Sequence, residues 1–140
     1  MRVLALDYGS ARCGTAVSDA SGTIASPLHA VTRPDSRAGL RELRDIVAER
    51  AVERVVVGLP LSLSGGDSEQ TRRSRAFASR LQRALGASVP VELYDERLTT
   101  RMASRLGGGA ARADEDSRAA AHLLEGWLAA GRRGRSGEGG

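Results

Sequence analysis

Acidic residues at three places in the chain have the chemistry needed to bind a divalent cation. Asp7 ends an apolar stretch, and Asp116 opens the last predicted helix. Asp95 and Glu96 end a second apolar stretch. A small protein that gathers carboxylates usually neutralises them with a cation, because like charges repel one another and lose hydration. Ligand sets made only of oxygen favour Mg²⁺ or Mn²⁺, and carboxylates that hold a pair of such ions suit phosphodiester hydrolysis. Such a site requires a fold that brings the three places together.

The apolar pattern predicts three strands, followed by alternating helices and strands. Pro27 interrupts the third strand, which indicates a sheet edge or a bulge, and Asp35 or Ser36 suits the start of the first helix. Three antiparallel strands followed by strand–helix–strand crossovers give an α/β fold with a mixed sheet and helices on both faces. We expect strands at residues 2–7, 13–18, 23–32, 54–58 and 89–94, and helices after residue 36 and at 69–85, 99–106 and 117–130.

The composition indicates one globular domain that suits an anionic partner. The chain has 140 residues, of which 41% are hydrophobic, and its net charge of +4 is compatible with nucleic acid without identifying it. Cys13 is the only cysteine, so no disulfide framework is expected, which fits a cytoplasmic location. No stretch approaches the ~20 apolar residues of a membrane span. We expect one domain at residues 1–130 and a disordered Arg/Gly-rich tail at 131–140.

Strand alternation places Val3, Ala5 and Asp7 on one face of the first strand. Asp7 thereby continues a core-facing row and emerges where the strand ends, although Asp-x-Gly is also typical of a tight turn. The same alternation sends Asp95 and Glu96 to opposite faces of their strand, so only one of them can readily join Asp7. Because both faces of the sheet are expected to be covered, alternation does not decide which one.

The last predicted helix carries an apolar stripe that includes the position of Asp116. Ala120, Leu123, Leu124 and Trp127 have the i, i+3, i+4, i+7 spacing of one helix face. Asp116 lies one helical turn before Ala120 and therefore falls on the same stripe. Acids in the first turn also favour the helix dipole by roughly 0.3–1 kcal/mol each. That effect explains an acid at this place, but it does not explain an acid on the buried stripe.

Four segments, which together span about residues 2–128, resemble the YqgF/RuvX family of ribonuclease-H-like nucleases. The most specific part is GLPLSLSGG followed by DERLTT, whereas one Asp-x-Gly is weak evidence. The resemblance implies a five-stranded mixed sheet and catalytic acids at Asp7, Glu96 and Asp116, which would hold one or two Mg²⁺ or Mn²⁺ ions. Asp95 would then have a structural role. The matching segments are LALDYGSARCGTAVSD (residues 4–19), VVVGLPLSLSGGDSEQT (55–71), DERLTT (95–100) and DSRAAAHLLEGWL (116–128).

Candidate substrate contacts lie near these acids. The resemblance implies that Arg12, Thr99 and Thr100 lie close to the active cleft. Backbone N–H groups beside Gly65 and Gly66 suit a phosphate near the metal site. Turn residues that simply follow a strand explain the same loop equally well, so both interpretations stay open.

The chain departs from the family in the loop before the third acid. Family members often carry a basic run there, whereas residues 107–115 read GGGAARADE, with a single base. Arg97, Arg101 and Arg105 are candidates to replace those phosphate contacts. The arginines of the helix at 69–85 are further candidates, but a solvated helix face explains them more simply.

The resemblance implies a metal-dependent nuclease that processes the 5′ end of pre-16S rRNA, free or in a pre-ribosomal particle. The alternative substrate is a Holliday junction in branched DNA. A resolvase must cut two strands symmetrically and should form a stable dimer, so monomer and homodimer both stay open. Two other classes compete with a nuclease. One is a non-catalytic RNA-binding assembly protein, and the other is a nucleotide-binding lobe of the actin and sugar-kinase superfamily, which needs two lobes to enclose ATP.

Overall fold

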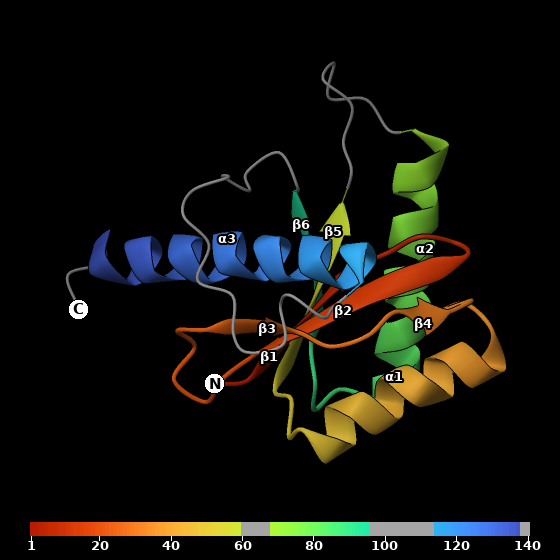
Figure 1. Cartoon of the computed structure of the whole chain (residues 1–140), viewed down its shortest axis with the longest axis horizontal. Coiled ribbons are helices and arrows are strands. Elements are labelled where there is room, and N and C mark those ends of the chain that lie inside the picture. Colours follow the sequence, from red (N-terminus) through yellow and green to blue (C-terminus); the bar gives the residue numbers. More distant parts are fainter. Residues whose placement is uncertain (60–67, 96–113, 138–140) are drawn as a thin grey trace.

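The structure is a computed structural model of the whole chain, and it describes residues 1–59, 68–95 and 114–137 (Figure 1). The strands in these ranges are β1 (Val3–Asp7), β2 (Arg12–Ser18), β3 (Ala25–Pro27), β4 (Val31–Thr32), β5 (Arg54–Leu59) and β6 (Val91–Asp95). The helices are α1 (Arg37–Glu49), α2 (Glu69–Leu85) and α3 (Glu115–Gly137). None of the described helices has both the length and the apolar character needed to cross a membrane.

The strands form a mixed sheet in the order β3-β2-β1-β5-β6. β2 is antiparallel to β1 and β3, whereas β5 is parallel to β1 and β6. The expected α/β fold, with antiparallel strands followed by parallel ones, is therefore confirmed. The strand expected at residues 23–32 is divided into β3 and β4, which pair separately with β2. The division follows from Pro27, which ends β3 and has no N–H to donate to a continuing ladder.

Helices cover both faces of the sheet. Figure 1 shows α3 lying across one face, with α1 and α2 on the other. Alternation along β1 sends Leu4 and Leu6 toward α1 and α2, and Val3 and Ala5 toward α3. All four side chains are fully buried. The central strands are therefore apolar on both sides, as expected for strands that have helices on each face.

Capping residues begin the first two helices, and end the second, where the sequence predicts. The Ser36 side chain accepts a hydrogen bond from the Gly39 N–H at the start of α1. Ser68 does the same for the Thr71 N–H at the start of α2. Gly86, with φ of 83°, follows the last residue of α2 in a conformation that favours glycine.

The last helix is longer than predicted. We expected it at residues 117–130, whereas α3 runs from Glu115 to Gly137 and so extends into the segment expected as a tail. The helix end was predicted too early because the prediction relied on the low apolar content of this segment. Arginine is a good helix former and no proline stops the helix, although each glycine costs about 1 kcal/mol. The helix predicted at 99–106 lies outside the described residues.

Candidate active site

Asp7 ends β1 on the face of the sheet that α3 covers. Val3 and Ala5 belong to the α3-facing cluster, and alternation along the strand places Asp7 on the same side. In the register between β1 and β2, Asp7 lies directly opposite Gly14. The packing of Val3 and Ala5 thus assigns Asp7 to the α3 side of its strand.

The first turn of α3 rests on the backbone of Gly14. A Cβ atom at this position would overlap the carbonyl group of Asp116 and would lie 2.8 Å from the backbone nitrogen of Ser117. Only glycine therefore admits the helix at this distance. Since Gly14 has Asp7 beside it in the sheet and Asp116 above it, the structure brings these two predicted acids together across more than a hundred residues of sequence.

Asp114 anchors the start of α3, and the sequence reasoning did not identify it. One carboxylate oxygen accepts a hydrogen bond from the Ser117 N–H at 2.7 Å, and the other accepts from the Ala30 N–H at 3.0 Å. Burial opposes its charge, but these hydrogen bonds and the nearby Arg12 guanidinium outweigh burial and lower the pKa of Asp114. An Asp three residues before Ser117 is a helix-capping signal that would have predicted the first of these contacts.

Ser117 joins the same turn of α3 to β2. Its hydroxyl oxygen accepts a hydrogen bond from the Thr15 N–H at 3.3 Å, and its side chain is fully buried. The residue before it, Asp116, is consequently held between two contacts with the sheet, one at Gly14 and one at Thr15. Few alternative positions are left to the Asp116 backbone.

Arg12 forms an ion pair with Asp116. Its Nε atom lies 3.3 Å from a carboxylate oxygen, with 67% of the Arg12 side chain and 36% of the Asp116 side chain exposed. Arg12, predicted to lie near the cleft, is thus beside one of the acids. The exposed pair is weak in free energy, about 0–1 kcal/mol, so Arg12 can exchange this partner for another anion at low cost.

The buried thiol of Cys13 experiences the charges of this region. Burial raises the pKa of Cys13, and the negative charges of Asp7, Asp35 and Asp116 raise it further. Cys13 therefore remains a protonated thiol at neutral pH and is no candidate nucleophile. The shared effect on one thiol also indicates that Asp7 and Asp116 contribute to one electrostatic environment.

Tyr8 attaches the end of β1 to the helices on the other face. Its ring stacks on Phe77 with centroids 4.6 Å apart, and its hydroxyl donates to Asp35. Arg80 of α2 donates to the same carboxylate at 3.1 Å, and Gln70 Nε2 donates to the Tyr8 carbonyl at 3.2 Å. The position next to Asp7 is thereby held by contacts on the α1 and α2 face of the sheet.

The remaining predicted site residues lie outside the described ranges. These are Glu96, Arg97, Thr99, Thr100, Gly65 and Gly66. Asp95, the last residue of β6, is described and pairs with Leu59 of β5. Within residues 1–59, 68–95 and 114–137 no group of three or more His, Cys, Asp or Glu side chains is placed to hold a metal ion. The described part of the chain thus contains two of the three predicted ligands.

Comparison with known proteins shows what the chain is related to. The family profile described as "RuvX: Holliday junction resolvase" matches residues 1–130. The chain belongs to the RuvX family. A RuvX relative from Anaeromyxobacter sp. (strain Fw109-5) is 44% identical over 91% of this chain and 96% of its own. Another from Myxococcus xanthus is 41% identical over 94% of this chain and 90% of its own, and both bear the name "Putative pre-16S rRNA nuclease".

Solved structures agree with this RuvX assignment at the level of the fold. Thermus thermophilus RuvC in complex with a Holliday junction substrate has a TM-score of 0.68 and 17% identity, and each chain covers 96% of the other. A second T. thermophilus RuvC structure gives a TM-score of 0.57 with 18% identity over 96% of this chain and 97% of that one. The expected ribonuclease-H-like fold and the nuclease class are thus confirmed for this RuvX protein.

Proposed function

We propose that the protein is a metal-dependent nuclease that processes the 5′ end of pre-16S rRNA in ribosome biogenesis. The observation that carries the proposal is the meeting of Asp7 and Asp116 at Gly14. Relatives at about 40% identity that carry the name of a pre-16S rRNA nuclease support this choice of substrate. The family description supports a Holliday junction as the second candidate.

The donor set at this place suits Mg²⁺ or Mn²⁺. Asp7 and Asp116 offer only carboxylate oxygens, which these ions prefer. Asp116 already pairs with the guanidinium of Arg12, so this carboxylate is accessible to a positive charge. The chemistry of the residues present therefore fits one or two divalent cations.

Packing along β6 supports Glu96 rather than Asp95 as the third ligand. Tyr94 packs against the α3-facing cluster, whereas Val91 packs against the cluster under α1 and α2. Alternation along the strand gives Asp95 the side opposite to Tyr94, away from the α3 face, so we infer that Glu96 is the ligand. Asp7, Glu96 and Asp116 would then share the α3 face of the sheet.

The described residues take simple roles in this mechanism. The chemistry supplied by a bound divalent cation is activation of water and stabilisation of charge on the leaving oxygen. The three acids hold the cation, and Arg12 turns from Asp116 to an oxygen of the phosphate to be cut. No histidine is required as a base, because a bound divalent cation would itself activate the water. His29 and His122 pair with Glu42 and Glu125 at 3.1 and 3.3 Å.

Cleavage of a 5′-extended 16S rRNA precursor with Mg²⁺ or Mn²⁺ tests the proposal. Asp7→Asn, Glu96→Gln and Asp116→Asn should each lower the rate by at least about 100-fold, because even the outer partners of metal ligands are worth 10–100-fold. Chelation of the metal should abolish cutting. Asp45→Asn, which removes an exposed acid from α1 on the other face, serves as the matched control and should cut at the wild-type rate.

A synthetic four-way DNA junction, tested in parallel, separates the substrates. Symmetric cutting of the junction without cutting of the precursor would replace the rRNA substrate with branched DNA. Variants of Asp7 and Asp116 that cut as well as wild type would overturn the assignment of these acids. If neither substrate is cut, even within pre-ribosomal particles, while RNA is bound, the protein is an assembly factor and the nuclease proposal is wrong.

A further inference from the structure

The arginines of α2 fall into two stripes with different surroundings. The helix carries Arg72, Arg73, Arg75, Arg80 and Arg83 but only one acid, Glu69. Arg73 and Arg80, two turns apart, form ion pairs with Glu69 at 2.9 Å and with Asp35 at 3.1 Å. The positive charges of this first stripe are therefore paired with acidic side chains of the protein itself.

The second stripe faces the edge of the sheet. Arg72, Arg75, Ser79 and Arg83 have the i, i+3, i+7, i+11 spacing of one helix face, and all four are exposed. Arg72 and Arg83 form no ion pair with any residue in the described ranges. At 1.5 Å per residue the stripe is about 16 Å long. The charges of Arg72 and Arg83 are thus available to an anionic partner.

An open groove of about 650 Å³ runs between this stripe and β6. Val91 and Leu93 of β6 provide an apolar wall, and Leu93 is 37% exposed. β6 is the last strand on its side of the described sheet. The groove is lined by Arg75, Ala78, Ser79, Gln82, Arg83, Val91 and Leu93. It therefore combines positive charge along one side with apolar surface along the other.

The first turn of α2, which leads to the groove, is joined to the end of β1. Gln70, in the first turn of α2, donates to the carbonyl of Tyr8, the residue after Asp7. Arg72 lies half a turn further along the helix, and Arg75 and Arg83 follow it away from the acids. A chain that passes through the site can thus continue along α2.

We propose that this α2–β6 groove binds a single-stranded segment of the nucleic acid substrate beside the bond that is cut. Arg72, Arg75 and Arg83 contact phosphates, and bases lie against Val91 and Leu93. A single strand fits better than a duplex, because only unpaired bases can turn their faces to an apolar wall. The structure thereby favours a binding role for arginines that the sequence pattern alone explained as a solvated face. The assignment rests on the proposed nuclease function.

Binding of a single-stranded RNA oligonucleotide tests the groove without any cleavage. Fluorescence anisotropy is measured over a range of salt concentrations, with Asp116→Asn as the parent protein. Arg72→Gln with Arg83→Gln should weaken binding roughly tenfold and reduce the salt slope by about 1.4, since each phosphate contact on a single strand contributes about 0.7. Leu93→Ser should weaken binding about threefold and leave the slope unchanged, because it removes apolar surface but no charge.

The matched control is Arg41→Gln with Arg44→Gln, which removes two exposed arginines from α1, beside a different cleft. This control should change the affinity by less than twofold. An equal loss in both double variants, or no loss in Arg72→Gln with Arg83→Gln, would overturn the proposal. So would a wild-type dimer, detected by sedimentation, that Leu93→Ser dissociates, because a second copy would then occupy the groove.

The groove and the nuclease function can fail separately. If wild type cuts the precursor but the groove variants bind normally, only the groove is wrongly assigned. If no substrate is cut but the groove variants lose RNA binding, the groove stands as an RNA-binding site and the nuclease function falls.

Discussion

The two faces of the sheet are packed in different ways. On the α3 face five of the ten buried residues of the cluster are alanines, namely Ala5, Ala16, Ala25, Ala120 and Ala121, and Gly14 lies at one end. On the face of α1 and α2 the largest buried side chains are Leu4, Leu6, Leu43, Phe77 and Leu81. Small residues let a helix approach the strands closely, whereas large ones keep it away and interdigitate.

This difference has a consequence for the chemistry. On the α3 face the main chain of Asp116 touches the main chain of Gly14, so an acid is positioned by backbone contact. On the other face helices are separated from the strands by side chains, which can change rotamer and absorb substitutions. The protein places its candidate ligands on the closely packed face and its basic helix on the adaptable one.

Gly14→Ala gives the sharpest test of this comparison. The added methyl group overlaps the Asp116 carbonyl, so α3 must shift. We expect a loss of about 3 kcal/mol or more in the free energy of unfolding, measured by denaturant titration. Because the shift displaces Asp116, calorimetry should also show that the folded fraction of the variant has lost most of its Mn²⁺ affinity.

Two control variants test whether the loss of stability and metal affinity is specific to the contact of Gly14 with α3. Gly131→Ala makes the same chemical change in α3, where no atom lies within 4 Å of the added carbon, and should stabilise the protein by roughly 0.5–1 kcal/mol. Leu43→Ala in α1, on the opposite face, removes a fully buried side chain and should cost about 2–5 kcal/mol but leave Mn²⁺ affinity unchanged. If Leu43→Ala weakened metal binding as much as Gly14→Ala, the contrast between the faces would not hold.

Arg12→Gln should produce a smaller effect with the opposite sign on the metal. The Arg12 guanidinium occupies the Asp116 carboxylate at 3.3 Å and so competes with a cation for it. Removing an exposed ion pair worth up to about 1 kcal/mol should tighten Mn²⁺ binding about three- to fivefold. The same variant should cut RNA more slowly, because a phosphate contact is lost.

Calorimetry with Mn²⁺ and steady-state cleavage measure the two halves of this prediction. Arg44→Gln, which removes one exposed charge from α1, should leave both quantities near their wild-type values. If metal affinity rose equally in both variants, the effect would come from net charge rather than from the Arg12 ion pair.

Most elements of the fold were predictable because their signals are local. The helix predicted at 69–85 matches α2, since Ser68 caps its start and Gly86 ends it. Alternation predicted that Asp7 continues the row of Val3 and Ala5. The end of α3 was not predictable in this way, because residues 131–137 contain three glycines and no apolar stripe, and the helix nevertheless runs to Gly137.

The candidate site was predictable only in part. Asp116 was indicated by its place on the apolar stripe of its helix, and Asp7 by the end of its strand. Gly14 and the contact of Asp114 with Ala30 were missed, because both depend on two segments that are distant in sequence. Alternation alone could not choose between Asp95 and Glu96, and Tyr94 bears on that choice only because the structure shows which cluster it joins.

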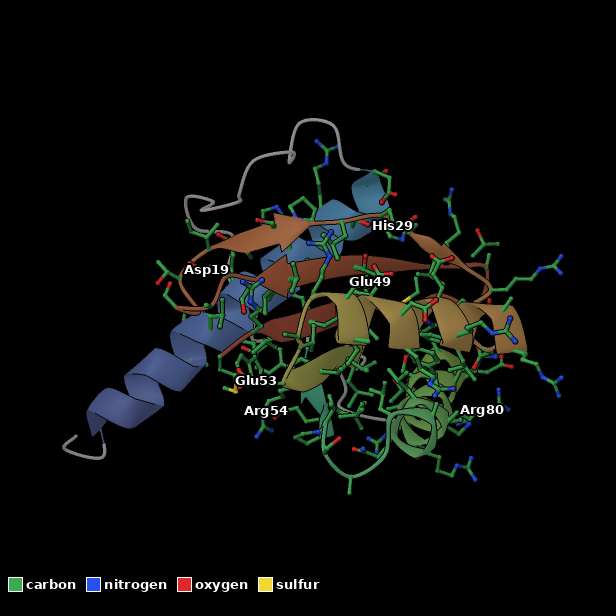
Figure 2. The ribbon with its side chains drawn as sticks, turned by 90° about the horizontal axis from the view of Figure 1, so that it is seen from below. Asp19, His29, Glu49, Glu53, Arg54 and Arg80 are labelled. Carbon is green, nitrogen blue, oxygen red and sulfur yellow. The ribbon has the colours of Figure 1, made fainter. Side chains whose placement is uncertain are left out.

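Asp19 offers the smallest and most local test, at the opposite end of β2 from Gly14 (Figure 2). Its carboxylate accepts from the Ser21 hydroxyl at 2.6 Å and from the Thr23 and Ile24 N–H groups at 2.8 and 3.0 Å. These hydrogen bonds lower the pKa of Asp19 to about 2. Asp19→Asn should lower the melting temperature at pH 7 by about 2–4 °C.

The effect of this substitution should depend on pH in one direction. A pKa that is lower in the folded state stabilises the protein above the unfolded value near 3.9, and this stabilisation is lost as the pH falls through about 2. The difference in melting temperature between wild type and Asp19→Asn should therefore shrink between pH 4 and pH 2, while Mn²⁺ affinity at pH 7 stays unchanged. A difference in melting temperature that is constant over this range would show that Asp19 stabilises the protein through the geometry of its hydrogen bonds rather than through its charge. A change in metal affinity would show that the two ends of β2 are coupled, against the view that backbone contact at Gly14 alone positions the acids.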